Sequence, residues 1–93
     1  MKKILIIEDQ ASMRRNICFI LDLEGYKTCS AANGREGVEV AKQEKPDLIL
    51  SDVMMPELDG YGVLQALGQD TAFATTPFIF LTAKGDRNDV RTG

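Results

Sequence analysis

The sequence predicts an α/β fold in which helices cover both faces of a doubly wound parallel sheet. Four short apolar segments recur along the chain, and a segment with helical character separates each from the next. Because the connections are short, each strand–helix–strand unit should be a right-handed crossover between parallel strands. A length of 93 residues is enough for one domain. We therefore expect a single domain over residues 1–93.

The first strand and helix follow from apolar patterning. Residues 3–7 (KILII) are apolar and rich in β-branched side chains, which suits a strand buried on both faces of a parallel sheet. Residues 11–24 should form a helix that Gly25 ends, because apolar side chains recur there at helical spacing. The apolar stripe of this helix consists of Met13, Ile17, Ile20 and Leu21.

The second strand and helix are marked by alternation and by a cap. Residues 26–31 (YKTCSA) are less apolar and alternate, as expected for a strand near a sheet edge. Asn33 is a suitable N-cap for a helix over residues 34–44. Val38 and Ala41 should mark the inner face of that helix.

Prolines precede the third and fourth strands. Residues 47–51 (DLILS) form the third strand, which Asp52 closes. After a loop, residues 61–69 should be helical, and residues 78–82 (FIFLT) form the fourth strand. The inner face of the third helix is expected to carry Val63, Leu64 and Leu67. Asp86 could cap one further helix.

Composition excludes several classes of function. The net charge of −3, without a stripe of lysine and arginine, argues against nucleic-acid binding. The apolar run at residues 4–7 is too short for a signal peptide, and no segment approaches membrane-spanning length. We expect a cytoplasmic protein that binds no membrane. Cys18 and Cys29 lack metal-ligand spacing and a histidine, so they should be small buried hydrophobic residues.

Acidic residues gather where the predicted strands end. Glu8 and Asp9 follow the first strand, Asp52 follows the third, and Thr82 follows the fourth. Ligands of such sheets bind outside the carboxyl ends of the strands. Three carboxylates at this edge would repel one another unless a cation joined them. A cluster with only oxygen ligands selects a hard cation, Mg²⁺ or Mn²⁺.

Other phosphate-binding and nucleophilic devices are missing from the sequence. It contains no GxxxxGK[ST] motif and no GxGxxG directly after a strand, which disfavours nucleotide binding. Histidine is absent, so Ser/His/Asp and Cys/His sets cannot form. A carboxylate nucleophile remains, and its chemistry at a metal site is formation of an aspartyl-phosphate.

The segments ILIIEDQ, DLILSDVMMPELDG and FIFLTAKGD, in this order, resemble the receiver domain of two-component response regulators, including the single-domain chemotaxis type. The resemblance extends from Lys3 to the end of the chain. It implies a flavodoxin-like receiver fold with strand order 2-1-3-4, to which the family adds a fifth strand.

The resemblance also implies roles for individual residues. Asp52 would be the phosphoacceptor, taking the phosphoryl group from a phosphohistidine of a histidine kinase or phosphotransfer protein. Asp9 and Asp52 would bind Mg²⁺ directly, Glu8 would reach it through water, and the backbone carbonyl of Met54 would add a ligand. Thr82 would be the switch residue whose hydroxyl binds a phosphoryl oxygen. Such a chain catalyses its own phosphorylation and is otherwise no enzyme; the phosphoryl group would switch binding of a downstream target.

The sequence departs from the family pattern at its C-terminal end. The family's fifth strand, the lysine at the end of that strand and the last helix are missing, so the domain is expected to be C-terminally incomplete. Lys84 should be a solvated loop residue and no replacement for that lysine. Residues 78–82 would then be an apolar edge strand, which seeks a partner. We expect a dimer or higher oligomer through this strand or the uncovered face, or else a chain that is a fragment of a longer protein.

Two other functions are compatible with the sequence. A truncated receiver could serve as an assembly or interaction module without a working switch. Alternatively, Asp52 could serve a phosphatase-like metal enzyme that acts on small phosphomonoesters. The latter family would require a second aspartate at the position of Met54.

Overall fold

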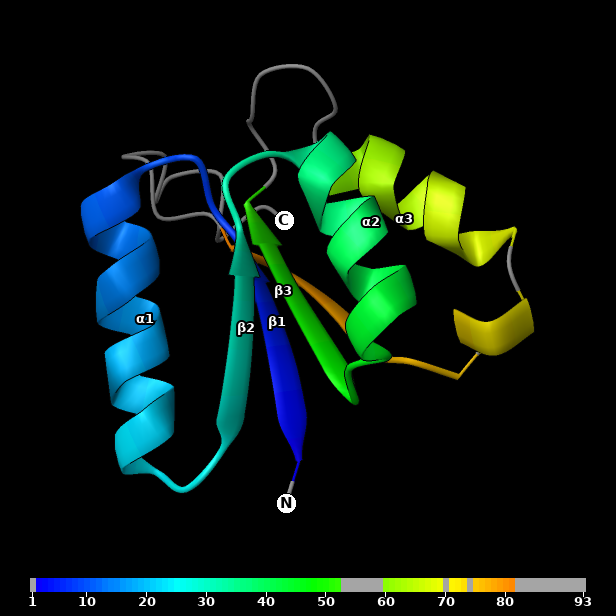
Figure 1. The fold of residues 1–93 in the computed structure, drawn as a ribbon. Helices are drawn as coiled ribbons and strands as arrows, with labels where there is room; N and C mark the ends of the chain where they lie inside the picture. Colours follow the sequence, from blue (N-terminus) through cyan, green and yellow to red (C-terminus); the bar gives the residue numbers. More distant parts are fainter. Residues whose placement is uncertain (1, 53–59, 70, 74, 82–93) are drawn as a thin grey trace, which may run out of the picture.

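The computed structural model describes residues 2–52, 60–69, 71–73 and 75–81, which alternate between strands and helices (Figure 1). The order of elements agrees with the predicted one. Along the chain these are β1 (Lys3–Ile7), α1 (Ala11–Leu23), β2 (Lys27–Ala31), α2 (Gly34–Glu44), β3 (Leu48–Asp52), α3 (Gly60–Gly68), the 3₁₀ helix η1 (Thr71–Phe73) and β4 (Phe78–Leu81).

The strands form a parallel sheet in the order β2-β1-β3-β4. Figure 1 shows α1 on one side of the sheet, with α2 and α3 together on the other side. The predicted doubly wound α/β class and the order 2-1-3-4 are thereby confirmed. This arrangement brings the carboxyl ends of all four strands to one edge of the sheet.

β1 is the centre of the hydrophobic core. Its side chains from Ile4 to Ile7 are at most 2% exposed, so both faces of this strand are buried, as predicted. Burying one such side chain contributes about 1.5–3 kcal/mol relative to leaving it exposed. The core on the side of α2 and α3 consists of Leu5, Ile7, Ala31, Ala41, Ile49, Val63, Leu67 and Phe73.

Two predicted helix ends are confirmed by their hydrogen bonds. Gly25 has a φ of 96°, and the N–H of Tyr26 donates to the Leu21 carbonyl, which ends α1. The side chain of Asn33 accepts the N–H of Glu36 at 2.8 Å and so caps α2. Tyr26 therefore belongs to the turn after α1, and β2 begins one residue later than predicted.

Two apolar side chains do not face the core as predicted. Ile20 is 57% exposed and Leu64 is 41% exposed. Among the described elements, α1 is the one helix on its side of the sheet; it packs against β2 and β1 and contains no fully buried residue. On α3 the contact is made by Val63 and Leu67, which lie one helical turn apart, while Leu64 is turned away from this line.

The fourth strand and its surroundings add one unpredicted element. η1 contributes Phe73, which is 8% exposed and belongs to the core. Within the described residues, β4 is an edge strand, as expected. The predicted last residue of this strand, Thr82, and the predicted helix start at Asp86 lie outside the described residues.

The packing of α2 on β1 predicts the effect of enlarging Gly37. A Cβ atom at this position would lie 2.5 Å from Ile7 Cδ1 and 2.9 Å from Ile7 Cγ1. Overpacking of this kind costs about 1–3 kcal/mol, and alanine recovers about 1 kcal/mol through its higher helix propensity. We expect Gly37→Ala to lower the free energy of unfolding by up to about 2 kcal/mol, as measured by urea denaturation.

Gly68→Ala in α3 is the matched control. No atom lies within 4 Å of a Cβ built at Gly68, so the same substitution meets no clash there. This variant should be as stable as the wild type or slightly more stable. Equal stability of both variants would show that α2 does not approach β1 as closely as described.

Candidate functional site

Three carboxylates meet at the carboxyl ends of β1 and β3. One carboxylate oxygen from each of Glu8, Asp9 and Asp52 lies within 4.8 Å of the others. Glu8 is 1% exposed and Asp52 is 2% exposed, while Asp9 is half-buried. The sequence-predicted convergence of these side chains is thus observed in the structure.

The register of the sheet produces this cluster. β1 and β3 are paired neighbours, and Ile7 lies opposite Ser51. The next residues along the chain are Glu8, directly after β1, and Asp52, the last residue of β3, and they lie at the same level of the sheet. The N–H of Glu8 donates to the carbonyl of Ala31 at 3.1 Å, which ties the end of β1 to β2 as well.

The turn between β1 and α1 is held by polar contacts. The Glu8 carboxylate accepts the N–H of Gln10 at 3.0 Å. The Arg14 guanidinium donates to the carbonyl oxygen of Glu8 at 2.7 Å. Arg14 was not among the residues expected at the site; its only signal in the sequence is a cation in the first turns of the helix that follows the acidic pair.

The chemistry of the cluster fits a small divalent cation. Two unit charges about 4 Å apart repel by about 4 kcal/mol at an effective dielectric of 20. Mg²⁺ binds oxygen at about 2.0–2.1 Å, so ligands on opposite sides of the ion are separated by about 4.2 Å. The three carboxylate oxygens lie within 4.8 Å of one another, so one ion between them would be within reach of all three, directly or through water. Glu8, Asp9 and Asp52 therefore suit an oxygen-coordinated hard cation.

Met54 and Thr82 lie outside the described residues, as does Lys84. The structure therefore shows the acidic part of the predicted site alone.

The cysteines lie away from the acidic cluster. Cys18 on α1 and Cys29 on β2 are both free and half-buried. Burial raises the pKa of both thiols, which lowers their reactivity. The predicted full burial of these small side chains is therefore not observed, since each keeps part of its surface exposed. In the described residues, no helix is long and apolar enough to cross a bilayer.

Comparison with known proteins identifies the family. The profile of the response regulator receiver domain matches residues 4–93, and the chain belongs to this family. The protein PilH of Pseudomonas aeruginosa is 35% identical over 89 residues, which are 96% of this chain and 74% of PilH. A probable transcriptional regulator, ycf27 of Porphyridium aerugineum, is 46% identical over 92 residues. The match covers 99% of this chain but only 37% of the length of ycf27.

Solved structures agree with this assignment. The chemotaxis response regulator CheY4 of Vibrio cholerae superimposes with a TM-score of 0.87 at 31% identity, over 100% of this chain and 78% of CheY4. The receiver domain of the sensor histidine kinase PA1611 of Pseudomonas aeruginosa has a TM-score of 0.83 at 30% identity, over 99% of this chain and 79% of that chain. The latter structure is described with a magnesium ion coordinated in its active-site cleft.

The repulsion within the cluster predicts an unusual stability effect. Asp52→Asn removes one of three clustered charges, so it should raise the free energy of unfolding in the absence of divalent ions, by about 1 kcal/mol or more. Mg²⁺ should stabilise the wild type by about 2.7 kcal/mol at a hundred times its Kd, and the variant clearly less. Urea denaturation with and without Mg²⁺ measures both effects.

Glu39→Gln on the exposed side of α2 is the control for net charge. It removes the same charge away from the cluster and should leave the response to Mg²⁺ unchanged. If Asp52→Asn destabilised the protein and kept the full response to Mg²⁺, the three carboxylates would not form a cation site.

Proposed function

We propose that this chain is a phosphoacceptor of two-component signal transduction and that Asp52 receives the phosphoryl group. The donor is a phosphohistidine of a histidine kinase or phosphotransfer protein. The observation that carries the proposal is the meeting of Glu8, Asp9 and Asp52 at the carboxyl ends of β1 and β3. Membership of the receiver family supports it.

The reaction follows from the position of Asp52. Its carboxylate oxygen attacks phosphorus, forming an oxygen–phosphorus bond while the bond from phosphorus to the histidine nitrogen breaks. The imidazole leaves and takes up a proton from solvent. Because charge spreads over the phosphoryl oxygens during transfer, positioning and neutralisation of charge supply most of the rate. Asp52 is thus modified in a reaction that the chain itself promotes.

The acidic cluster needs a cation for this reaction. We infer that Asp9 and Asp52 hold Mg²⁺ directly and that Glu8 reaches it through water, because the Glu8 carboxylate already accepts the N–H of Gln10. Mg²⁺, or Mn²⁺ in its place, would neutralise charge on the phosphoryl oxygens. The magnesium ion described for the PA1611 receiver domain supports this inference.

Three further parts of the proposal come from the family resemblance. The backbone carbonyl of Met54 would complete the metal site, and the Thr82 hydroxyl would bind a phosphoryl oxygen and so report phosphorylation. The phosphorylated form would bind a downstream target. We propose a cytoplasmic location, without direct binding of nucleic acid or membrane.

Phosphoryl labelling tests whether Asp52 is the nucleophile. The wild type with Mg²⁺ and acetyl phosphate, or a phosphorylated kinase, should gain an acid-stable, hydroxylamine-labile phosphoryl group, and chelation of Mg²⁺ should abolish the label. Asp52→Asn should lose at least about 90% of the label, because its amide is no nucleophile. Intact-mass spectrometry measures the added phosphoryl group.

Asp47→Asn is the matched control, since Asp47 is exposed at the opposite end of β3. It should be labelled like the wild type. Labelling that persists in Asp52→Asn would assign the nucleophile to another residue. Turnover of a chromogenic phosphate ester would instead favour a phosphatase.

A second proposal concerns assembly, and exposed apolar side chains on the α1 side of the molecule support it. Phe19 and Leu23 on α1 are 62% and 70% exposed, and Ile79 on β4 is 48% exposed. Exposed apolar side chains of this size on one side of a molecule can contribute to an interaction surface. We propose that the chain forms a dimer or higher oligomer through β4 or through this face, as an interaction module would.

Light scattering coupled to size-exclusion chromatography tests the assembly. The wild type should have at least twice the monomer mass, and Ile79→Lys should shift it toward the monomer. Leu64→Lys is the matched control, because Leu64 is similarly exposed, at 41%, on α3 at the opposite face. A stable wild-type monomer at low micromolar concentration would contradict this proposal.

A further inference from the structure

The turn between β1 and α1 carries two of the three site carboxylates but has no ordinary helix cap. Gln10 is the N-cap residue of α1, and its side chain makes no capping hydrogen bond. An N-cap side chain normally fixes the entry of the chain into a helix. Other contacts must therefore hold Glu8 and Asp9 in place.

Two contacts replace the cap, and they lie on both sides of Asp9. On the C-terminal side, the N–H of Gln10 donates to the Glu8 carboxylate at 3.0 Å. On the N-terminal side, the Arg14 guanidinium donates to the Glu8 carbonyl, which belongs to the peptide that joins Glu8 to Asp9, at 2.7 Å. The second contact is charge-assisted and therefore stronger than a neutral hydrogen bond.

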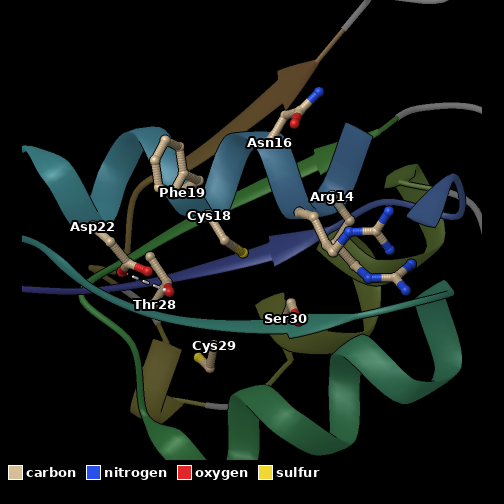
Figure 2. Close-up of a pocket in the computed structure, with 9 residues that line it drawn as sticks. Arg14, Asn16, Cys18, Phe19, Asp22, Thr28, Cys29 and Ser30 are labelled. Atoms are coloured by element: carbon tan, nitrogen blue, oxygen red, sulfur yellow. Dashed lines mark hydrogen bonds between the residues drawn. The ribbon is translucent and has the colours of Figure 1, made fainter. Parts of the chain in front are cut away.

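Arg14 reaches this carbonyl from the first turns of α1. Its own N–H donates to the Gln10 carbonyl at 2.9 Å, so the backbone of Arg14 is part of the first helical turn. Its side chain is half-buried at one end of the groove between α1 and β2, and Asp22 and Thr28 lie at the other end (Figure 2). The start of α1 is thus tied back to the end of β1 by one side chain.

We propose that Arg14 is a positioning residue for the cation site: by holding the Glu8 peptide, it presents the Asp9 carboxylate beside Asp52. This inference rests on the proposed function, because the site is the one formed by Glu8, Asp9 and Asp52. Groups that orient the ligands of a metal change its affinity about 10- to 100-fold when they are removed. Arg14 touches neither the cation nor the phosphoryl group and acts through the backbone.

The direction in which the affinity for the cation changes when Arg14 is replaced separates a positioning role from a purely electrostatic one. A guanidinium near the site repels a divalent cation, so removal of the charge alone would tighten cation binding. Loss of positioning weakens it. Arg14→Lys keeps the charge but loses the planar group with its fixed donors, whereas Arg14→Gln loses both.

Calorimetric titration of Mg²⁺ into the unphosphorylated protein is the test. Both Arg14→Lys and Arg14→Gln should raise the Kd for Mg²⁺ about tenfold. Arg15→Lys and Arg15→Gln are the matched controls, since Arg15 is exposed and, among the described residues, makes no hydrogen bond to the turn. The Arg15 variants should keep the Kd within about twofold of the wild type.

Amide hydrogen exchange gives a second reading that does not depend on the cation. In both Arg14 variants the Gln10 N–H should exchange at least about tenfold faster, because the turn opens locally. The amides of β1 should keep their wild-type exchange rates, which separates a local effect from general destabilisation. If Arg14→Gln does not fold, the conservative variant Arg14→Lys still tests whether Arg14 has a positioning role.

The outcomes distinguish this inference from the function on which it rests. If the wild type binds Mg²⁺ and both Arg14 variants bind it equally well or more tightly, Arg14 has no positioning role and the proposed function stands. If the wild type neither binds Mg²⁺ nor accepts a phosphoryl group, the proposed function is wrong.

Discussion

The pairing of β1 with β3 is the contact on which the rest of the site depends. β1 is buried on both faces, and its register with β3 places Ile7 opposite Ser51. Glu8 and Asp52 then emerge at the same level of the sheet. Side chains of a strand alternate between faces, so a slip of one residue would turn Asp52 to the other face. The apolar side chains of β1 therefore determine where the charged site lies.

Burial of neighbouring carboxylates at this position destabilises the fold, but the same burial favours the proposed chemistry. Glu8 and Asp52 are almost fully buried as neighbouring carboxylates, an arrangement that is stable only when hydrogen bonds hold the backbone around it. The contacts from Ala31, Gln10 and Arg14 supply this support at the end of β1. A divalent cation would then relieve the repulsion and neutralise charge on a phosphoryl group. The same feature would account for both the proposed cation requirement and the proposed nucleophile.

The two faces of the sheet are covered unequally in the described part of the chain. α2 and α3 together bury a continuous core, whereas α1 alone packs on the other face and leaves Phe19, Ile20 and Leu23 exposed (Figure 1). The chain belongs to the receiver-domain family, and we propose that this exposed surface contacts other proteins. The acidic edge and the apolar α1 side are therefore separate features, and we propose that the first serves chemistry and the second contact.

Local signals in the sequence determined the elements, the ends of α1 and α2 and the edge at which the carboxylates meet. Gly25 and Asn33 act on their own neighbours, and a carboxylate that follows a parallel strand always lies at the same edge of the sheet. Tertiary structure alone decided the exposure of Ile20 and Leu64, because burial depends on which elements pack nearby. It also decided the contact from Arg14 to the Glu8 carbonyl, since that contact requires the angle at which α1 leaves β1. Such an angle is the product of packing against the whole sheet and has no signature in a short stretch of sequence.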